Sequence, residues 1–124
     1  MIDINGMAHV ILTVSQYDKA KAFYLRLMSA MGLETVFDNE GLTYFVGART
    51  AVGIQPCKPE FAGERFEQGR VGLHHICLRA RSREDVDKVD ALLREMEARG
   101  VGPDVVCYSA AISACEKGHQ WRRA

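Results

Sequence analysis

The sequence contains one pattern twice, and this repetition limits the folds that the chain can adopt. Segment 6–14 reads Gly-Met-Ala-His-Val-Ile-Leu-Thr-Val, and segment 72–80 reads Gly-Leu-His-His-Ile-Cys-Leu-Arg-Ala. In both copies an apolar run favours a strand, and an apolar stripe with helical spacing follows it. A period shared by a strand and the next helix predicts an internally duplicated fold. The repetition also places His9 and His75 at equivalent positions.

The first copy predicts the element order βαβββ. A strand is expected over 9–14, and the helix after it should open with a capping box from Ser15 to Asp18 and end at Gly32. Three short strands are expected next, followed by a linker rich in Pro and Gly; these segments are 33–37, 42–46, 50–55 and 56–70.

The second copy breaks off after its helix. A strand over 72–80 and a helix from a capping box at Ser82 to Gly100 repeat the first half of the unit. Three strands should follow, but 101–124 has a Pro at a helix start and a pattern typical of a helix-turn-helix. We therefore expect an α+β fold: a βαβββ unit, an incomplete second βα unit and a short helical tail.

Composition argues against several classes of protein. The 124 residues include 16 basic and 16 acidic side chains, and a net charge of zero gives no general attraction to nucleic acid or anionic membranes. No apolar run approaches the roughly 18 residues of a membrane span, and the N-terminal residues lack a secretory signal. The four cysteines form no CxxC pair, so we expect reduced thiols in a cytoplasmic protein.

Side-chain alternation predicts a mixed face on the side of the sheet away from the helices. His9, Ile11 and Thr13 share this face of the first strand, while the alternate apolar residues should meet the helix. Gln55 has the corresponding parity in the strand 50–55, where small neighbouring residues leave room beside it, and His75 has it in the second copy. Two imidazoles and an amide can therefore lie on one side of a curved sheet.

A βαβββ unit used twice, with a His opening the first strand of each copy, resembles the vicinal oxygen chelate superfamily. That superfamily includes glyoxalase I, extradiol dioxygenases and bleomycin-resistance proteins. The resemblance spans about residues 5–99 and is carried by segments 8–14, 19–24 and 73–78. It implies a cup-shaped sheet that holds one divalent metal ion (Zn, Ni, Mn or Fe), with His9, Gln55 and His75 at ligand positions. The fourth ligand, usually a Glu, belongs to the strands that are missing here.

The tail resembles a pentatricopeptide repeat. This predicts two regions, an incomplete glyoxalase/bleomycin-resistance-like domain over 1–100 and a pentatricopeptide-repeat-like fragment over 101–124. In the repeat family, Asp104 and Ser109 match positions that read an RNA base. Because solenoid repeats need about three neighbours to bury a continuous core, RNA is not an expected partner of this chain.

Three functions remain open from the sequence. The first is a metal-dependent lyase or dioxygenase acting on a small molecule with adjacent oxygens, whose catalytic residues are unassigned because the Glu that often acts as base is missing. The second is a non-catalytic relative that binds a small molecule, and the third is an RNA-binding repeat fragment. A homodimer is expected because the uncovered edge of an incomplete cup favours pairing. The ordinary alternatives are a structural role for either His, a plain polar role for Gln55, and a packed or sheet-edge position for His74.

Overall fold

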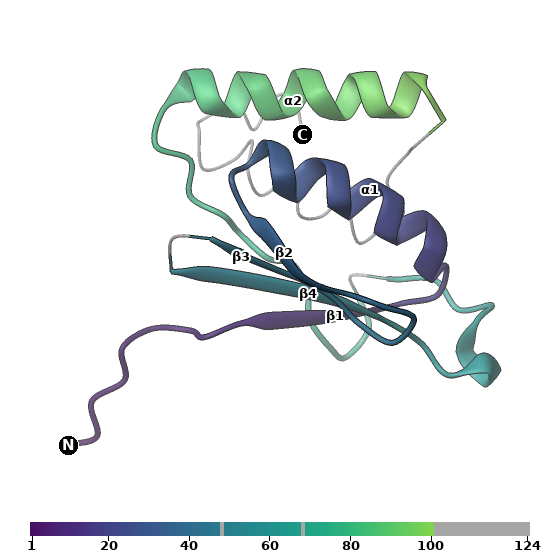
Figure 1. The fold of residues 1–124 in the computed structure, drawn as a ribbon. Helices are drawn as coiled ribbons and strands as arrows, with labels where there is room; N and C mark the ends of the chain where they lie inside the picture. Colours follow the sequence, from purple (N-terminus) through teal and green to yellow (C-terminus); the bar gives the residue numbers. More distant parts are fainter. Residues whose placement is uncertain (48, 68, 101–124) are drawn as a thin grey trace. The chain divides into compact units, whose positions relative to one another are not determined.

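The computed structural model describes residues 1–47, 49–67 and 69–100. It divides the chain into two units, Met1–Gly63 and Glu64–Ala124. The first unit contains the predicted order βαβββ and then a short 3-10 helix (Figure 1). Its elements are β1 (Val10–Val14), α1 (Tyr17–Ala30), β2 (Glu34–Asp38), β3 (Thr43–Gly47), β4 (Thr50–Pro56) and η1 (Pro59–Phe61). The predicted α+β class with a mixed sheet is thereby confirmed.

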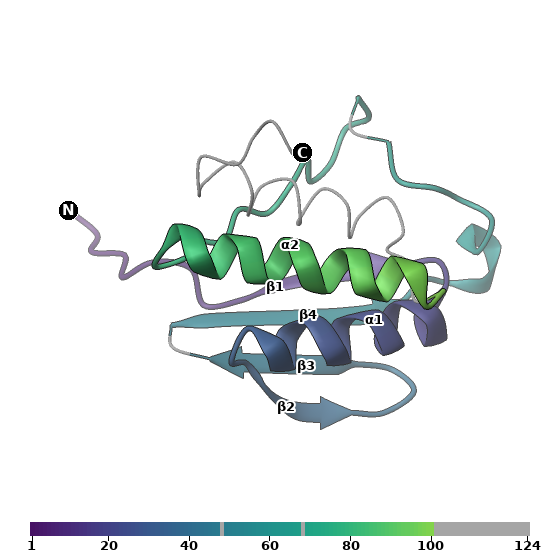
Figure 2. The ribbon, with the colours of Figure 1, turned by 90° about the horizontal axis from the view of Figure 1, so that it is seen from above.

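The four strands of the first unit form one sheet in the order β1-β4-β3-β2. β1 and β4 are parallel, with Leu12 opposite Ile54, whereas β3 is antiparallel to both of its neighbours. Figure 2 shows the strands side by side with α1 over them. The last strand of the unit therefore lies next to the first, which brings distant parts of the sequence into register.

One face of this sheet is packed and the other is open. Helix α1 contacts β4 and β2, and its apolar side chains recur every three or four residues, which is the spacing of one helix face. The buried side chains of the first unit are Leu12, Val14, Ala20, Phe23, Tyr24, Leu27, Met28, Thr43, Phe45, Val52 and Ile54. Ile11, Phe37 and Val46 stay exposed, so the strand alternation separates a core face from an open face.

The ends of α1 confirm one local prediction and correct another. Gly32 follows the helix with a φ of 83°, a left-handed conformation that glycine adopts without strain. The capping box predicted from Ser15 is wrong, because Gln16 occupies the N-cap position and makes no side-chain capping hydrogen bond. Since the helix begins at Tyr17, Ser15 lies one residue too early to cap it.

The second unit contains the predicted helix but lacks the predicted strand. Helix α2 (Arg83–Ala98) starts at Ser82, whose Oγ accepts a hydrogen bond of 3.1 Å from the backbone N–H of Asp85. Gly100 follows the helix with a φ of 76°. No strand forms within 69–100, so the prediction of a strand over 72–80 is wrong. A strand needs a neighbouring strand with which its backbone groups can pair, and residues 69–100 contain no second strand that could serve.

Several sequence-based predictions concern residues beyond this description. The helical tail and the pentatricopeptide-like fragment expected over 101–124 lie outside the described residues. The domain boundary at residue 100 falls at the same limit and stays a prediction. Within the described ranges, no helix has the length and apolar character needed to cross a membrane.

We expect Phe45→Ala to lower the free energy of unfolding by about 3–5 kcal/mol, the usual cost of removing a fully buried phenylalanine ring. Phe45 is 0% exposed, whereas Phe37 on the open face is 55% exposed. The matched change Phe37→Ala should cost less than about 1 kcal/mol. Urea unfolding followed by circular dichroism measures both, and equal losses would contradict this assignment of the two faces.

Candidate functional site

Three aromatic rings form a row across the open face of the first unit. His9 directly precedes β1, Tyr44 lies in β3 and Phe37 lies in β2. The ring centroids of His9 and Tyr44 are 6.0 Å apart with an interplanar angle of 79°, and those of Tyr44 and Phe37 are 6.2 Å apart. We call His9, Tyr44 and Phe37 the aromatic row. Both distances suit edge-to-face or tilted aromatic contacts.

Two irregularities of the sheet allow this row to form. Strand β4 lies between β1 and β3, and at Gly53 it has no side chain to separate Tyr44 from β1. A Cβ at Gly53 would lie 2.9 Å from Tyr44 Cδ2 and 3.2 Å from Ile11 Cγ1. The pairing of β2 with β3 shifts register between Thr35 and Phe37, and a bulge of this kind re-aims side chains.

Gln55 lies on the same open face but at the other end of β1 from His9. It is opposite Thr13 in the parallel pair, and its Nε2 donates a hydrogen bond of 2.9 Å to Thr13 Oγ1. Thr13 lies four positions after His9, which is about 13 Å along a strand. The small residues of β4 do not leave the room beside Gln55 that the sequence predicted, because Tyr44 and Ile11 crowd the position of Gly53.

His75 belongs to the second unit, where it contacts its neighbour His74. Both side chains are exposed, and their Nδ1 atoms are 2.6 Å apart, so one ring donates and the other accepts. The predicted packed or sheet-edge position of His74 is wrong, since 72–80 forms no strand. Sequence reasoning missed this contact, although the adjacent His-His pair was the available signal.

Among the described residues, no group of three or more His, Cys, Asp or Glu side chains could hold a metal ion. The predicted ligand set contains only two such residues, His9 and His75, together with the amide of Gln55. The first unit provides two of these three side chains on its open face, and His75 comes from the second unit. That these three side chains bind one metal ion together therefore stays a prediction.

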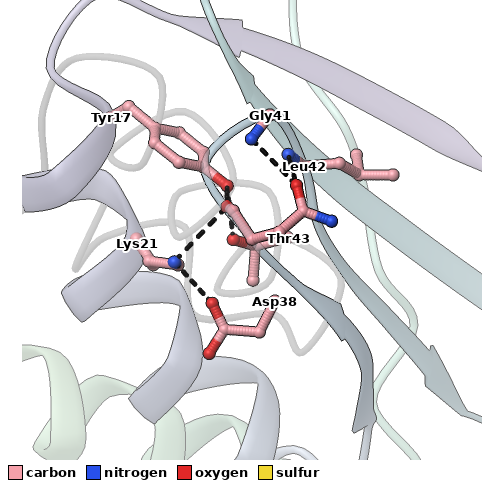
Figure 3. Close-up of polar contacts among 7 residues, drawn as sticks. Tyr17, Lys21, Asp38, Gly41, Leu42 and Thr43 are labelled. Carbon is pink, nitrogen blue, oxygen red and sulfur yellow. Dashed lines mark hydrogen bonds and ion pairs between the residues drawn. The ribbon is translucent and has the colours of Figure 1, made fainter.

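A polar cluster joins the start of α1 to the turn between β2 and β3 (Figure 3). The Tyr17 hydroxyl donates a hydrogen bond of 2.8 Å to the Asn39 carbonyl oxygen and lies 2.7 Å from Thr43 Oγ1. Lys21 forms an ion pair with Asp38. The hydrogen bond to the Asp38 carboxylate is the main cause that raises the pKa of Lys21 above its ordinary value of 10.5.

The turn itself is held by an asparagine. Asn39 Oδ1 accepts hydrogen bonds from the backbone N–H groups of Gly41 and Leu42, at 2.9 and 3.0 Å, an arrangement that favours a tight turn. The polar cluster thus fixes the β2–β3 hairpin against α1. Because the hairpin carries Phe37 and Tyr44 on its other side, the cluster also positions two rings of the aromatic row.

Comparison with known proteins gives a family and a set of similar structures. A sequence model of the Glyoxalase/Bleomycin resistance protein/Dioxygenase superfamily matches residues 6–107. Among curated proteins no significant match is found. A candidate glyoxalase from Bacillus halodurans is 25% identical in sequence, with a TM-score of 0.66, and the match covers 77% of this chain and 70% of that chain.

Two more distant structures show the same fold. The fosfomycin resistance protein FosX from Listeria monocytogenes, in a mutant form with Mn(II) and 1S,2S-dihydroxypropylphosphonic acid, is 20% identical, with a TM-score of 0.52 and coverage of 77% of this chain and 67% of that one. Lactoylglutathione lyase from Agrobacterium tumefaciens is 21% identical, with a TM-score of 0.51 and coverage of 76% and 72%. The partial glyoxalase-like fold expected from the sequence is confirmed.

We expect the polar cluster to stabilise the fold at neutral pH and to weaken in alkali. The folded-state pKa of Lys21 is raised, so its contribution is fully present below about pH 10.5 and is lost as the pH rises through the folded-state value. The free energy of unfolding should therefore fall more steeply above about pH 10.5 for the wild type than for Lys21→Met. Denaturant unfolding across this range tests it, with Lys19→Met as the matched control; identical slopes for the wild type and Lys21→Met would refute it.

Proposed function

Because the chain belongs to the glyoxalase, bleomycin resistance protein and dioxygenase superfamily, we propose that it binds a divalent metal ion and a small molecule with two adjacent oxygen atoms. The observation that carries this proposal is the exposed imidazole of His9 at the end of an apolar aromatic row on an open sheet face. One solved relative contains Mn(II) together with a dihydroxy phosphonic acid, and another is a lactoylglutathione lyase.

We propose His9, Gln55 and His75 as the metal ligands. Because Gln55 is opposite Thr13, about 13 Å along the strand from His9, it would have to move toward His9 to share the same ion. Imidazole nitrogen suits Zn, Ni and Fe, and an amide oxygen is acceptable to Mn as well. Gln55 donates from Nε2 to Thr13, so its carbonyl oxygen is the atom offered to a metal. His75 uses Nδ1 in its contact with His74, which leaves Nε2 as the ligand atom. A hydrogen bond at the other ring nitrogen is the usual support for a metal-bound histidine.

The aromatic row supplies the rest of the binding surface. A bound divalent ion acts as a Lewis acid toward substrate oxygens. Tyr44 and Phe37 present an apolar surface beside His9, and contact with a substrate's carbon skeleton there would remove water from the reacting end. The rings of Tyr44 and His9 also make an edge-to-face contact. A lyase or dioxygenase reaction is the activity that we propose, with the general base unassigned.

A non-catalytic binding protein of the same superfamily is the second candidate. The observation that favours it is the neutral ligand set, since neither His9, Gln55 nor His75 can act as the carboxylate base that glyoxalase-like chemistry often uses. The RNA-binding alternative depends on residues 101–124, which lie outside the described part of the chain.

We expect His9→Ala and His75→Ala each to weaken Ni²⁺ binding at least about tenfold, because each variant loses one imidazole ligand of the ion. His74→Ala should cause a smaller loss, since it removes only the partner of His75. Affinity should also fall on acidification, because a metal-bound imidazole must be deprotonated. Isothermal titration calorimetry on the full chain measures all of these affinities.

The control for this experiment is His119→Ala, which removes the remaining histidine of the chain. The assigned ligands are supported if His119→Ala binds Ni²⁺ as tightly as the wild type while His9→Ala and His75→Ala bind it more weakly. Gln55→Ala tests the third position and should give an intermediate loss. Equal Ni²⁺ affinity for the wild type, His9→Ala and His75→Ala would eliminate the site.

We also propose that the chain forms a homodimer. Strand β1 is an edge of the four-stranded sheet, and exposed edges favour pairing with another chain. Ile11 and Val46 on the open face are each 40% exposed, which adds apolar surface that association can cover. Size-exclusion chromatography with light scattering should give twice the mass of the 13.8 kDa chain. A stable monomer at micromolar concentration would be the contrary result.

A further inference from the structure

A pocket of about 360 Å³ opens where the segment before β1 meets the β3–β4 turn. Its lining includes Asn5, Met7, Ala8, Val46, Arg49 and Ala51. Val46 and Ala51 are cross-strand partners, and they share the parity of Tyr44 and Gly53 on the open face. Ala8 directly precedes His9. The pocket therefore adjoins the His9 end of the aromatic row, within the first unit alone.

Arg49 adopts a backbone conformation that is unfavourable for its residue type. Its φ is 74°, and it is the single described non-glycine residue with a positive φ. In this region the Cβ of an L-residue crowds the backbone, so a hairpin turn normally places glycine, asparagine or aspartate there. A strained residue that persists at the wall of a pocket points to a role for its side chain.

The pocket has the chemistry of an anion site. Arg49 offers a permanent positive charge with several N–H donors, and Asn5 adds an amide. No acidic residue lines the pocket, and no salt bridge to Arg49 occurs among the described residues. The ordinary alternative is a solvated turn arginine, since Arg49 is exposed and the tight β3–β4 turn by itself calls for a positive φ. The adjoining pocket, which has Arg49 and no acidic residue in its lining, is what favours the anion site.

We propose that this pocket binds the anionic group of the chain's small-molecule ligand, a carboxylate or a phosphate-type oxyanion. Arg49 would pair with two of its oxygens, since a guanidinium matches such groups in a bidentate geometry. As a subsite for the same ligand, the inference rests on the proposed function. The inference adds a substrate class to that function. The ligand would be a small acid that carries an anionic group in addition to its two adjacent oxygen atoms.

The test uses the metal-free full chain, labelled with ¹⁵N and titrated separately with inorganic phosphate and acetate while amide shifts are followed by NMR. Wild type should show saturable shifts at residues around the pocket. Arg49→Gln and Arg49→Gly should weaken binding at least about tenfold, as expected for a lost charge-assisted hydrogen bond. Lys19→Gln, which removes one positive charge from the exposed side of α1, should bind as the wild type does.

Arg49→Gly separates function from folding. Glycine adopts a positive φ without strain, so this variant should melt at the same temperature as the wild type or higher while losing the anion. The stronger of the two probes identifies the oxyanion class. Unchanged affinity in both Arg49 variants, an equal loss in Lys19→Gln, or no saturable binding of either probe would overturn the proposal. Because no metal is present, this result is independent of the metal-binding test at the histidines.

Discussion

Residues Val10 to Val14 of β1 pair in parallel with residues 52–56 of β4, and most of the first unit follows from this pairing. Parallel neighbours cannot be joined by a tight turn, so the chain between them must make a crossover, which α1 and the β2–β3 hairpin provide. The helix covers the face on which Leu12 and Ile54 are buried. The strict alternation of strand side chains then leaves His9 and Gln55 on the other face.

That second face owes its shape to contacts that bridge strands. Gly53 allows the ring of Tyr44 to lie against β4, and this brings Tyr44 within aromatic contact of His9. On the helix side of the sheet, Tyr17 and Lys21 hold the hairpin that carries Tyr44. Contacts on the packed face thus hold the hairpin that carries two rings of the open face.

Membership of the superfamily and the open face of the first unit together support the proposal of a small-molecule ligand. The proposed metal ligands and the proposed anion pocket, together with the aromatic row, would suit a small acid more than a large or uncharged molecule. The second unit differs from the first because its described residues contain a helix but no strand. The two histidines that the repeat makes equivalent thus lie in different local structures, with His9 against Tyr44 and His75 against His74.

The sequence alone determined the order of elements in the first unit, the buried and exposed sides of β1 and the glycine stops of both helices, because each depends on neighbours a few residues apart. The absence of a strand over 72–80 was beyond its reach, since a strand exists only where another backbone is available to pair with it. The space at Gly53 was misread for a similar reason: the ring that fills it comes from another strand. The pocket at Arg49 also joins segments that are distant in the chain. Local periodicity fixes which side a residue faces, and only the tertiary structure decides what it meets there.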